Sequence, residues 1–463
     1  MNKSIVLTLV LVFLVASCLV VAKPAFSSPG VAGDSWVSKA PMQVARGGLG
    51  VAVVNGRIYA IGGSTQKGLS TYYADGIVGT NEEYDPETDT WTFKASMPTP
   101  IVYFSVAVYQ NKIYCMGGYT KNATVTGVNE VYDPATDTWE TKAPMPTPRA
   151  LLRANTANGK IYLIGGYASA NSSSGFSYSI LNEVYDLATD SWTTKAPLLT
   201  ATGSYASAVV DNKIYVINSN LNQIYETEND SWSYGTPLLG VFGGVAVATT
   251  GVMTPKRIYA LGVISYGESG YAVLSENNVR VYDPETDSWT FGADVPTKRQ
   301  EFGVAVVNDM LYAIGGQTYD ISSIPYVSSV TPYATNEQYT PIGYGTVPPK
   351  VSVISPENKT YTSSNVSLIF LVNKQTSWMG YSLDGQETAT VTGNITIAGL
   401  TNGLHNITVY AKDAFENIGT SETIIFSIAK EPETFPTTWL AAAVVSVAVV
   451  SVGILVYFRK RRR

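Results

Sequence analysis

Short apolar runs alternate with turn residues along most of the chain, and one arrangement of them recurs. A complete copy reads "ALLRANTANGK", "IYLIGG", "NEVYDL" and "SWTTKAP" within residues 150–197. Runs of this length, rich in β-branched and aromatic residues and bounded by Gly, Asn, Asp and Pro, predict β-strands. Each copy is therefore expected to form a unit of four strands.

Three marks define the repeat, and each occurs six times. An apolar run that usually ends in Gly-Gly, as in "IYAIGG", is followed by a tyrosine in an "EVYDP"-like motif and then by a tryptophan in a "TDTW"-like motif. The tyrosines are Tyr84, Tyr132, Tyr185, Tyr225, Tyr282 and Tyr339, and the tryptophans are Trp36, Trp91, Trp139, Trp192, Trp232 and Trp289. Neighbouring tryptophans are 40 to 57 residues apart. A period of this size indicates a repeat architecture.

In order and spacing these marks resemble the kelch repeat, over roughly residues 34–345. The resemblance implies a six-bladed β-propeller, in which tyrosine and tryptophan fill the space between twisted blades. Trp36 precedes the first Gly-Gly, whereas the last copy stops at "NEQYTPIGYG" without a tryptophan. The N-terminal "DSWVSKAPM" is therefore expected to supply the fourth strand of the last blade and close the ring.

The pattern changes after Pro348 and Pro349. Residues 350–430 contain about seven short strands separated by turns, which predicts a β-sandwich. This segment resembles the immunoglobulin-like or fibronectin-type-III-like modules of prokaryotic surface proteins. The chain is thus predicted to be all-β, with a propeller at 28–345, a sandwich at 346–430 and a Pro-containing spacer at 431–438.

Two uninterrupted apolar runs frame these domains. Ile5–Ala22 follows Lys3 and precedes small residues, which predicts a signal peptide over residues 1–27. Trp439–Phe458 carries no charge and is long enough for a transmembrane helix. The tail "RKRRR" at 459–463 would then lie in the cytoplasm. Together they predict a single-pass type I protein of a prokaryotic, archaeal-type cell membrane with an extracellular body.

Glycosylation sequons agree with an extracellular body. Asn-X-Ser/Thr occurs at Asn122, Asn171, Asn229, Asn358, Asn365, Asn394 and Asn406.

Charge and composition narrow the chemistry. The formal net charge is −6 even with the basic tail included, which argues against a nucleic-acid partner. Cys18 and Cys115 are expected to form no disulfide, and Cys115 to be a buried strand residue. The single histidine, His405, is expected to be exposed in a turn. Without a histidine, the propeller cannot be a copper oxidase resembling galactose oxidase, and we predict no cofactor and no metal.

Four arginines are candidates for ligand binding. Arg46, Arg149 and Arg299 each precede the second strand of their blade by the same number of residues, and are expected to crown the channel. Arg153 falls on a first strand, where the other blades have small residues, and is expected to line the channel. A guanidinium suits a carboxylate ligand. The alternatives are a structural part of the kelch pattern for the first three, and a solvated channel residue for Arg153.

Four of the loops after the second strands are long, one is intermediate and the fourth blade has almost none. These loops are rich in Tyr, Ser and Gly, a composition typical of binding surfaces. Their candidate residues are Tyr72, Tyr73, Tyr119, Tyr167, Tyr178, Tyr266, Tyr271, Tyr319, Tyr326 and Tyr333. The alternative is that these rings fold back on their own blades. The repeated acids, such as Asp85, Asp89, Asp133 and Asp137, are expected to stabilise turns.

These features predict a surface binding or adhesion protein without catalytic activity, which recognises a protein or glycan through the Tyr-rich face. Two alternatives remain open. One is an enzyme acting on an acidic sugar, a mutarotase or hydrolase of the sialic-acid type, which would need an acid or a tyrosine beside the arginines. The other is a purely structural component of the cell envelope.

Overall fold

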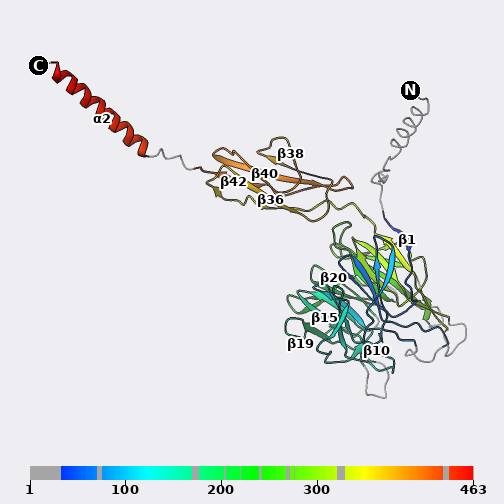
Figure 1. Cartoon of the computed structure of the whole chain (residues 1–463). Coiled ribbons are helices and arrows are strands. Elements are labelled where there is room, and N and C mark those ends of the chain that lie inside the picture. The colour runs from blue at the N-terminus through cyan, green and yellow to red at the C-terminus, as the bar shows by residue number, and fades with distance from the viewer. Residues whose placement is uncertain are drawn as a thin grey trace, which may run out of the picture. The chain divides into compact units, whose positions relative to one another are not determined.

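The computed structural model describes residues 33–69, 76–168, 177–202, 205–218, 220–238, 242–266, 272–275, 277–320, 329–430 and 437–461. The chain divides into two compact units between Val347 and Pro348. Both units are built from antiparallel strands, apart from one short parallel pair in the second unit, so the prediction of a mostly β chain is confirmed (Figure 1).

Six antiparallel sheets form the main ring of the first unit. In the described residues each has four principal strands, which follow sequence order in five sheets, whereas the sixth takes its outermost strand from the N-terminus. From the innermost strand outward, they are β2 (Gly50–Val54), β3 (Arg57–Ile61), β5 (Asn81–Asp85) and β6 (Thr90–Lys94); β8 (Ser105–Tyr109), β9 (Lys112–Met116), β11 (Asn129–Asp133) and β12 (Thr138–Thr141); β14 (Arg153–Ala157), β15 (Lys160–Ile164), β18 (Asn182–Asp186) and β19 (Ser191–Thr194); β20 (Ala206–Val210), β21 (Lys213–Asn218), β22 (Leu221–Glu226) and β23 (Ser231–Tyr234); β24 (Phe242–Ala248), β25 (Ile258–Tyr266), β27 (Val279–Asp283) and β28 (Ser288–Gly292); and β29 (Gly303–Val307), β30 (Met310–Ile314), β33 (Asn336–Thr340) and β1 (Ser35–Lys39). A further strand, β26 (Ala272–Ser275), pairs with β25.

The sheets form a closed ring. The innermost strands β2, β8, β14, β20, β24 and β29 contact one another in that order, and β29 contacts β2 again. The N-terminal strand β1 completes the last sheet by pairing with β33, with Trp36 opposite Tyr339. The first and last parts of the propeller therefore share one sheet, as the sequence predicted (Figure 1).

Tyrosine, aspartate and tryptophan join each blade to the previous one. In the second blade, the Tyr132 hydroxyl donates to Asp137 Oδ1 at 2.6 Å, and the same oxygen accepts the Ala95 backbone N–H at 2.8 Å. Trp139 Nε1 donates to the Ala95 carbonyl at 2.8 Å. Because Ala95 follows the outermost strand of the first blade, the motif bridges two blades.

The last blade uses the same bridge with parts from both ends of the propeller. Tyr339 donates to Asp34 Oδ1 at 2.7 Å, and Trp36 Nε1 donates to the Ala293 carbonyl at 2.8 Å. The expected turn role holds for Asp133, whose Oδ1 accepts the Ala135 N–H at 3.0 Å. Asp137 does more than stabilise a turn, because its carboxylate also accepts a hydrogen bond from Ala95 of the neighbouring blade.

Short strands form a second tier at the end of the propeller where the second strands finish. They are β4 (Gly68–Leu69), β7 (Ile101–Val102), β10 (Tyr119–Thr120), β13 (Arg149–Ala150), β16 (Tyr167–Ala168), β17 (Ser177–Tyr178), β31 (Gln317–Asp320) and β32 (Ser329–Pro332). β32 pairs with both β31 and β4, so this tier links the last blade to the first.

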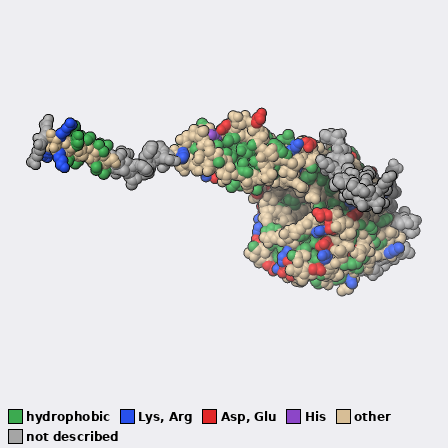
Figure 2. Space-filling model, turned by 45° about the horizontal axis from the view of Figure 1, so that its top comes forward, with side chains coloured by type: hydrophobic (Ala, Val, Ile, Leu, Met, Phe, Trp, Pro, Cys, Tyr) green, Lys and Arg blue, Asp and Glu red, His purple; other side chains and the backbone are tan. Residues whose placement is uncertain are grey.

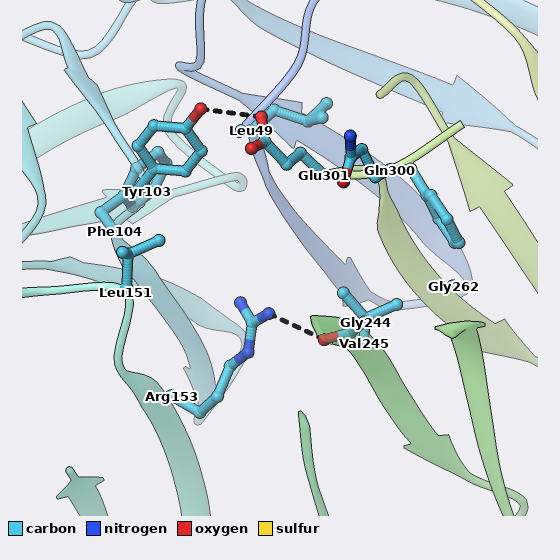
Figure 3. Close-up of a pocket in the computed structure, with 12 residues that line it drawn as sticks. Leu49, Tyr103, Phe104, Leu151, Arg153, Gly244, Val245, Gly262, Gln300 and Glu301 are labelled. Atoms are coloured by element: carbon cyan, nitrogen blue, oxygen red, sulfur yellow. Dashed lines mark hydrogen bonds between the residues drawn. The ribbon is translucent and has the colours of Figure 1, made fainter. Parts of the chain in front are cut away.

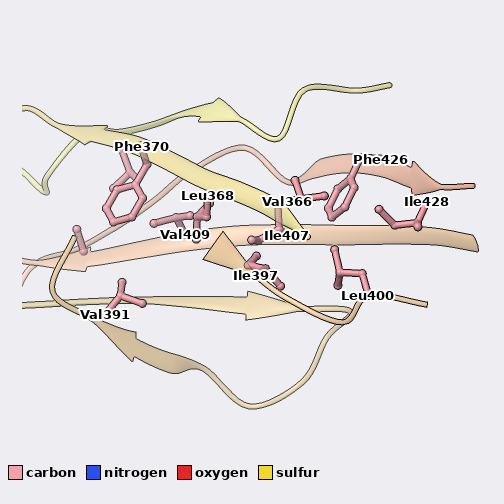
Figure 4. Packing of buried hydrophobic residues seen from close by; sticks show 12 residues of the cluster. Val366, Leu368, Phe370, Val391, Ile397, Leu400, Ile407, Val409, Phe426 and Ile428 are labelled. Atoms are coloured by element: carbon pink, nitrogen blue, oxygen red, sulfur yellow. The ribbon is translucent and has the colours of Figure 1, made fainter. Parts of the chain in front are cut away.

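The second unit contains two sheets around one apolar core. The first has β34 (Val351–Ser355), β36 (Val366–Val372) and β39 (Ile395–Ile397); the second has β35 (Thr360–Tyr361), β42 (Ile424–Ile428), β40 (Gly403–Lys412), β37 (Trp378–Leu383), β38 (Ala389–Val391) and β41 (Ile418–Thr420). Alternate residues of β36 are buried, and Leu368 packs with Ile407, Val409 and Phe426 between the sheets (Figure 4). The resemblance to immunoglobulin or fibronectin modules stays a prediction.

His405 corrects one expectation. It lies on β40, not in an exposed turn, and is 6% exposed. Its Nδ1 is 2.7 Å from Asp384 Oδ2 and its Nε2 is 2.8 Å from the Thr401 carbonyl. The adjacent turn residues misled the prediction, because the strand begins at Gly403. Cys115 is buried and free, as expected.

The two terminal apolar runs have different outcomes. The predicted signal peptide lies outside the described residues. The segment 439–458 falls within helix α2 (Thr437–Lys460). Within the ranges described, no helix is long and apolar enough to cross a membrane, so the transmembrane prediction finds no support.

Candidate functional site

Four equivalent positions form one side of the channel mouth. Gly48, Tyr103, Leu151 and Glu301 each lie nine residues before the first residue of the second strand in their blade. All four have positive φ angles, between 53° and 63°. Their backbones are joined, because Gly48 N–H donates to the Glu301 carbonyl at 2.9 Å and Tyr103 N–H to the Gly48 carbonyl at 3.0 Å. Leu151 N–H donates to the Tyr103 carbonyl at 3.0 Å.

The left-handed backbone is costly for three of these residues, because only glycine adopts it without strain. Non-glycine residues in this conformation tend to gather at functional sites. The same backbone conformation thus carries a different residue in each of these four blades. Gly48 has no side chain, whereas the other three blades present the phenol of Tyr103, the isobutyl group of Leu151 and the carboxylate of Glu301.

Beneath this mouth lies a cavity of about 150 Å³. Leu49, Phe104 and Phe302 supply part of its apolar wall. Arg153 enters from one side, whereas Glu301 and Tyr103 lie on the other, as Figure 3 shows. A second cavity of about 220 Å³ shares Arg153 and continues along the innermost strands.

Arg153 is held by backbone carbonyls. Its Nε donates to the Tyr205 carbonyl at 3.0 Å, and its Nη2 donates to the Gly244 carbonyl at 3.2 Å (Figure 3). The Tyr205 hydroxyl accepts the Arg153 backbone N–H at 3.0 Å. Burial lowers the pKa of the guanidinium, since desolvation disfavours the charged form. Arg153 therefore lines the channel, as predicted.

Glu301 is the acceptor of a polar cluster. Its Oε2 accepts the Tyr103 hydroxyl at 2.7 Å, and its Oε1 accepts the Tyr319 hydroxyl at 2.8 Å. Gln317 Nε2 also donates to Oε2. Burial raises the pKa of the Glu301 carboxyl, and the three donors oppose that rise by stabilising the carboxylate. Burial and the Glu301 charge also raise the pKa of Tyr103 and Tyr319, which stay neutral donors.

The other three arginines are not available to a ligand, which corrects their assignment as ligand-binding residues. Arg46 and Arg149 are 0% exposed and Arg299 is 2% exposed. They pair with Glu82 at 2.9 Å, Glu183 at 2.7 Å and Glu337 at 2.6 Å, respectively. Each guanidinium also donates to carbonyls of its own blade; Arg299 binds those of Thr297, Ala313 and Gly315. These three arginines therefore fit the alternative stated in the sequence analysis, that they are a structural part of the kelch pattern.

The candidate tyrosines divide into three groups. Tyr72, Tyr73, Tyr271 and Tyr326 lie outside the described residues, and for Tyr266 only the backbone is described, at the end of β25. Tyr119, Tyr167, Tyr319 and Tyr333 are half-buried, and Tyr178 is 55% exposed. Tyr319 points its hydroxyl at Glu301, and the Tyr119 ring packs edge-on to Tyr103 with centroids 6.5 Å apart. The structure therefore gathers two of them around the mouth.

The sequence prediction missed Tyr103, Glu301 and Gln317. A signal was present for Tyr103 and Glu301, because the position two residues after the one that holds arginine in three blades carries a different residue in each of four blades, namely Gly48, Tyr103, Leu151 and Glu301. A comparison of the residues that repeat between blades does not reveal this position, because its side chain does not repeat.

The sequon asparagines Asn122, Asn229, Asn358, Asn365, Asn394 and Asn406 are exposed, and Asn171 lies outside the described residues. Figure 2 shows acidic and basic side chains interspersed on the visible face of the first unit. The described residues contain no group of three or more His, Cys, Asp or Glu side chains suited to a metal ion.

Comparison with known proteins agrees with the repeat. The kelch motif matches residues 45–98, 100–146 and 148–199. The mouse influenza virus NS1A-binding protein homolog is 44% identical over 78 residues, which are 17% of this chain and 11% of that protein. Alpha-scruin of Limulus polyphemus is 36% identical over 87 residues, 19% of this chain and 9% of that protein. Halomucin of Haloquadratum walsbyi is 31% identical over 140 residues, 27% of this chain and 2% of that protein.

The chain spans about a tenth or less of the length of these relatives. Among solved structures, that of YjhT matches with a TM-score of 0.49 and 17% identity, covering 63% of this chain and 98% of that one. The motif matches, together with the ring of sheets and its repeated Tyr–Asp–Trp bridges, show that this chain contains kelch repeats arranged in a β-propeller.

Proposed function

We propose that the chain is a recognition module without catalytic activity, which binds a protein or glycan on the propeller face that surrounds the channel mouth. The observation that carries this proposal is the cluster of tyrosines around Glu301. Tyr103 and Tyr319 bond to the carboxylate, and Tyr119 packs against Tyr103. Rigid rings with polar tips give a large contact area at a low cost in conformational entropy.

Extracellular display is part of the proposal. Six sequon asparagines are exposed, and the N-terminal apolar run has the pattern of a secretory signal. Labelling of intact cells with a reagent that does not enter them tests this. Labelling of the propeller only after lysis would contradict extracellular display.

The binding proposal is tested with the purified full-length chain on an array of glycans and cell-envelope proteins. Tyr178 on the mouth face is 55% exposed and Tyr234 on the outermost strand β23 is 56% exposed, which makes them a matched pair. Tyr178→Ser and Tyr119→Ser are expected to weaken a retained ligand, whereas Tyr234→Ser leaves it bound. Equal loss in all three variants, or no retained ligand, would refute recognition by this face.

A second candidate function is that of an enzyme acting on an acidic sugar. This alternative requires an acid or a tyrosine near an arginine. Glu301 and Tyr103 lie across the cavity from Arg153, which favours it (Figure 3). A carboxyl and a phenol are able to exchange protons with a bound sugar. The test follows anomer exchange of sialic acid by NMR in the presence of the chain and of Glu301→Gln. A rate equal to the uncatalysed one would exclude the mutarotase form, and a hydrolase is tested by release of sialic acid from a glycoside.

A further inference from the structure

Arg153 presents a cation to the channel without an anionic partner among the described residues. Among the residues that the structure describes, it is the only Arg or Lys that lines either channel cavity. Its two side-chain hydrogen bonds go to neutral carbonyls, through Nε and Nη2. By contrast, the other three propeller arginines discussed above are each paired with a glutamate.

The fold does not require this cation. The equivalent residues of the first, second, fourth and sixth blades are Gly50, Ser105, Ala206 and Gly303, and each begins the innermost strand as Arg153 does. Placing a guanidinium in a confined channel costs free energy unless an opposite charge or water compensates it. An anionic ligand would supply that compensation.

The opposite wall limits what else such a ligand carries. The Glu301 oxygens accept three hydrogen bonds, and a carboxylate has room for about four. A hydroxyl or amino group is therefore able to donate to Glu301 where a plain carboxylate offers no donor. The cavity of about 150 Å³ has roughly the size that takes one benzene molecule, which limits the bound group to a few heavy atoms.

We propose that the channel cavity binds a small carboxylate that also carries a hydroxyl or amino group. The carboxylate contacts Arg153, and the donor group faces Glu301 and Tyr103. This inference deepens the proposed function, since the cavity opens at the same mouth, and it is tested by separate measurements.

The test uses glycolate, which has both groups, and two analogues that each lack one. Acetate keeps the charge without the hydroxyl, and glycolamide keeps the hydroxyl without the charge. Titration calorimetry on the full-length chain is expected to rank glycolate above acetate and to detect no binding of glycolamide. Equal binding of glycolate and glycolamide would overturn the proposed contact between Arg153 and the carboxylate. Equal binding of glycolate and acetate would overturn the proposed contact between Glu301 and the hydroxyl group.

Variants separate ligand binding from folding. Arg153→Met is expected to reduce glycolate binding at least 10-fold and to leave the thermal midpoint of the propeller unchanged or higher, since it removes an unpaired cation. Glu301→Gln is expected to remove the preference of glycolate over acetate. A lower midpoint in Arg153→Met with unchanged glycolate affinity would show that Arg153 is structural and overturn the proposal. Array binding in the tyrosine variants reports on the outer face independently.

Discussion

Arg299 offers a direct test of the conclusion that three of the arginines build the blades. Its guanidinium contacts Glu337 at 2.6 Å and three backbone carbonyls between 2.7 and 2.9 Å, and it is 2% exposed. Arg299→Met removes all of these donors and leaves Glu337 buried. We therefore expect this variant to fold less stably but to keep whatever ligand the channel mouth binds.

The magnitude follows from the partners that remain. Breaking a buried ion pair by removing one partner typically costs about 3–5 kcal/mol. The second blade provides an internal reference, because it has Ile101 at the equivalent position and still buries Glu130, which accepts the Thr99 hydroxyl at 2.6 Å. Glu337 has the same support from Thr297, also at 2.6 Å. The loss is therefore expected near the lower limit, about 3 kcal/mol.

Unfolding in denaturant, followed by tryptophan fluorescence, measures this loss. At roughly 2 °C per kcal/mol, the thermal midpoint falls by about 6 °C. Arg57→Met is the matched control, since Arg57 pairs with Asp85 but is 37% exposed, and a surface pair contributes about 0–1 kcal/mol. Arg299→Met/Glu337→Gln is expected to recover part of the loss. A cost below about 1 kcal/mol for Arg299→Met would refute the structural assignment.

Three further predictions concern other parts of the chain. Asp34→Ala removes the acceptor of Tyr339 and is expected to destabilise the propeller by about 1–3 kcal/mol, as denaturant unfolding would measure. The Thr401 carbonyl and Asp384 raise the pKa of His405 above 6.5. The protonated His405 therefore stabilises the second unit fully below pH 6.5, and this stabilisation is lost as the pH rises through the raised pKa. Thermal unfolding between pH 5 and 9 would show a fall in the midpoint of the second unit that His405→Gln lacks. Burial raises the pKa of the Cys115 thiol, so a thiol reagent is expected to label it only after unfolding, and rapid labelling of the native chain would contradict this.

The repeated features could be predicted from the sequence because each has one physical cause that acts six times. Tyr132 and Trp139 lie between blades, as expected of large rings in a twisted ring of sheets. The closure by Ser35–Lys39 could be predicted because, in a ring of repeats, Trp36 precedes the first Gly-Gly and the last copy has no tryptophan. The position of Arg153 on a first strand correctly predicted that it lines the channel.

The sequence could not separate a buried arginine from an exposed one at the channel rim. Arg149 precedes its strand at a place where a side chain can point outward to the mouth or back into its blade. The choice depends on Glu183, which is distant in sequence and lies on the third strand of the same blade. The Glu183 partner stands in "NEVYD", which the sequence assigns to the third strand, but the pattern does not show that this glutamate faces an arginine of the same blade. Contacts between residues this far apart are set by register, which a single sequence does not give.

The residues that repeat and the residues proposed to bind a ligand therefore occupy different positions in the blades. The Arg–Glu pairs and the Tyr–Asp–Trp bridges recur because a blade needs them, and substitution there acts through stability. The left-handed position at the mouth keeps its backbone in four blades, while its side chain changes from Gly48 to Tyr103, Leu151 and Glu301. Since the fold accepts glycine at this position without strain, the phenol and the carboxylate are not needed to form the turn. Together with Arg153, they are residues at which the ring departs from its own symmetry, and all three line the channel cavity in which we propose that a ligand binds.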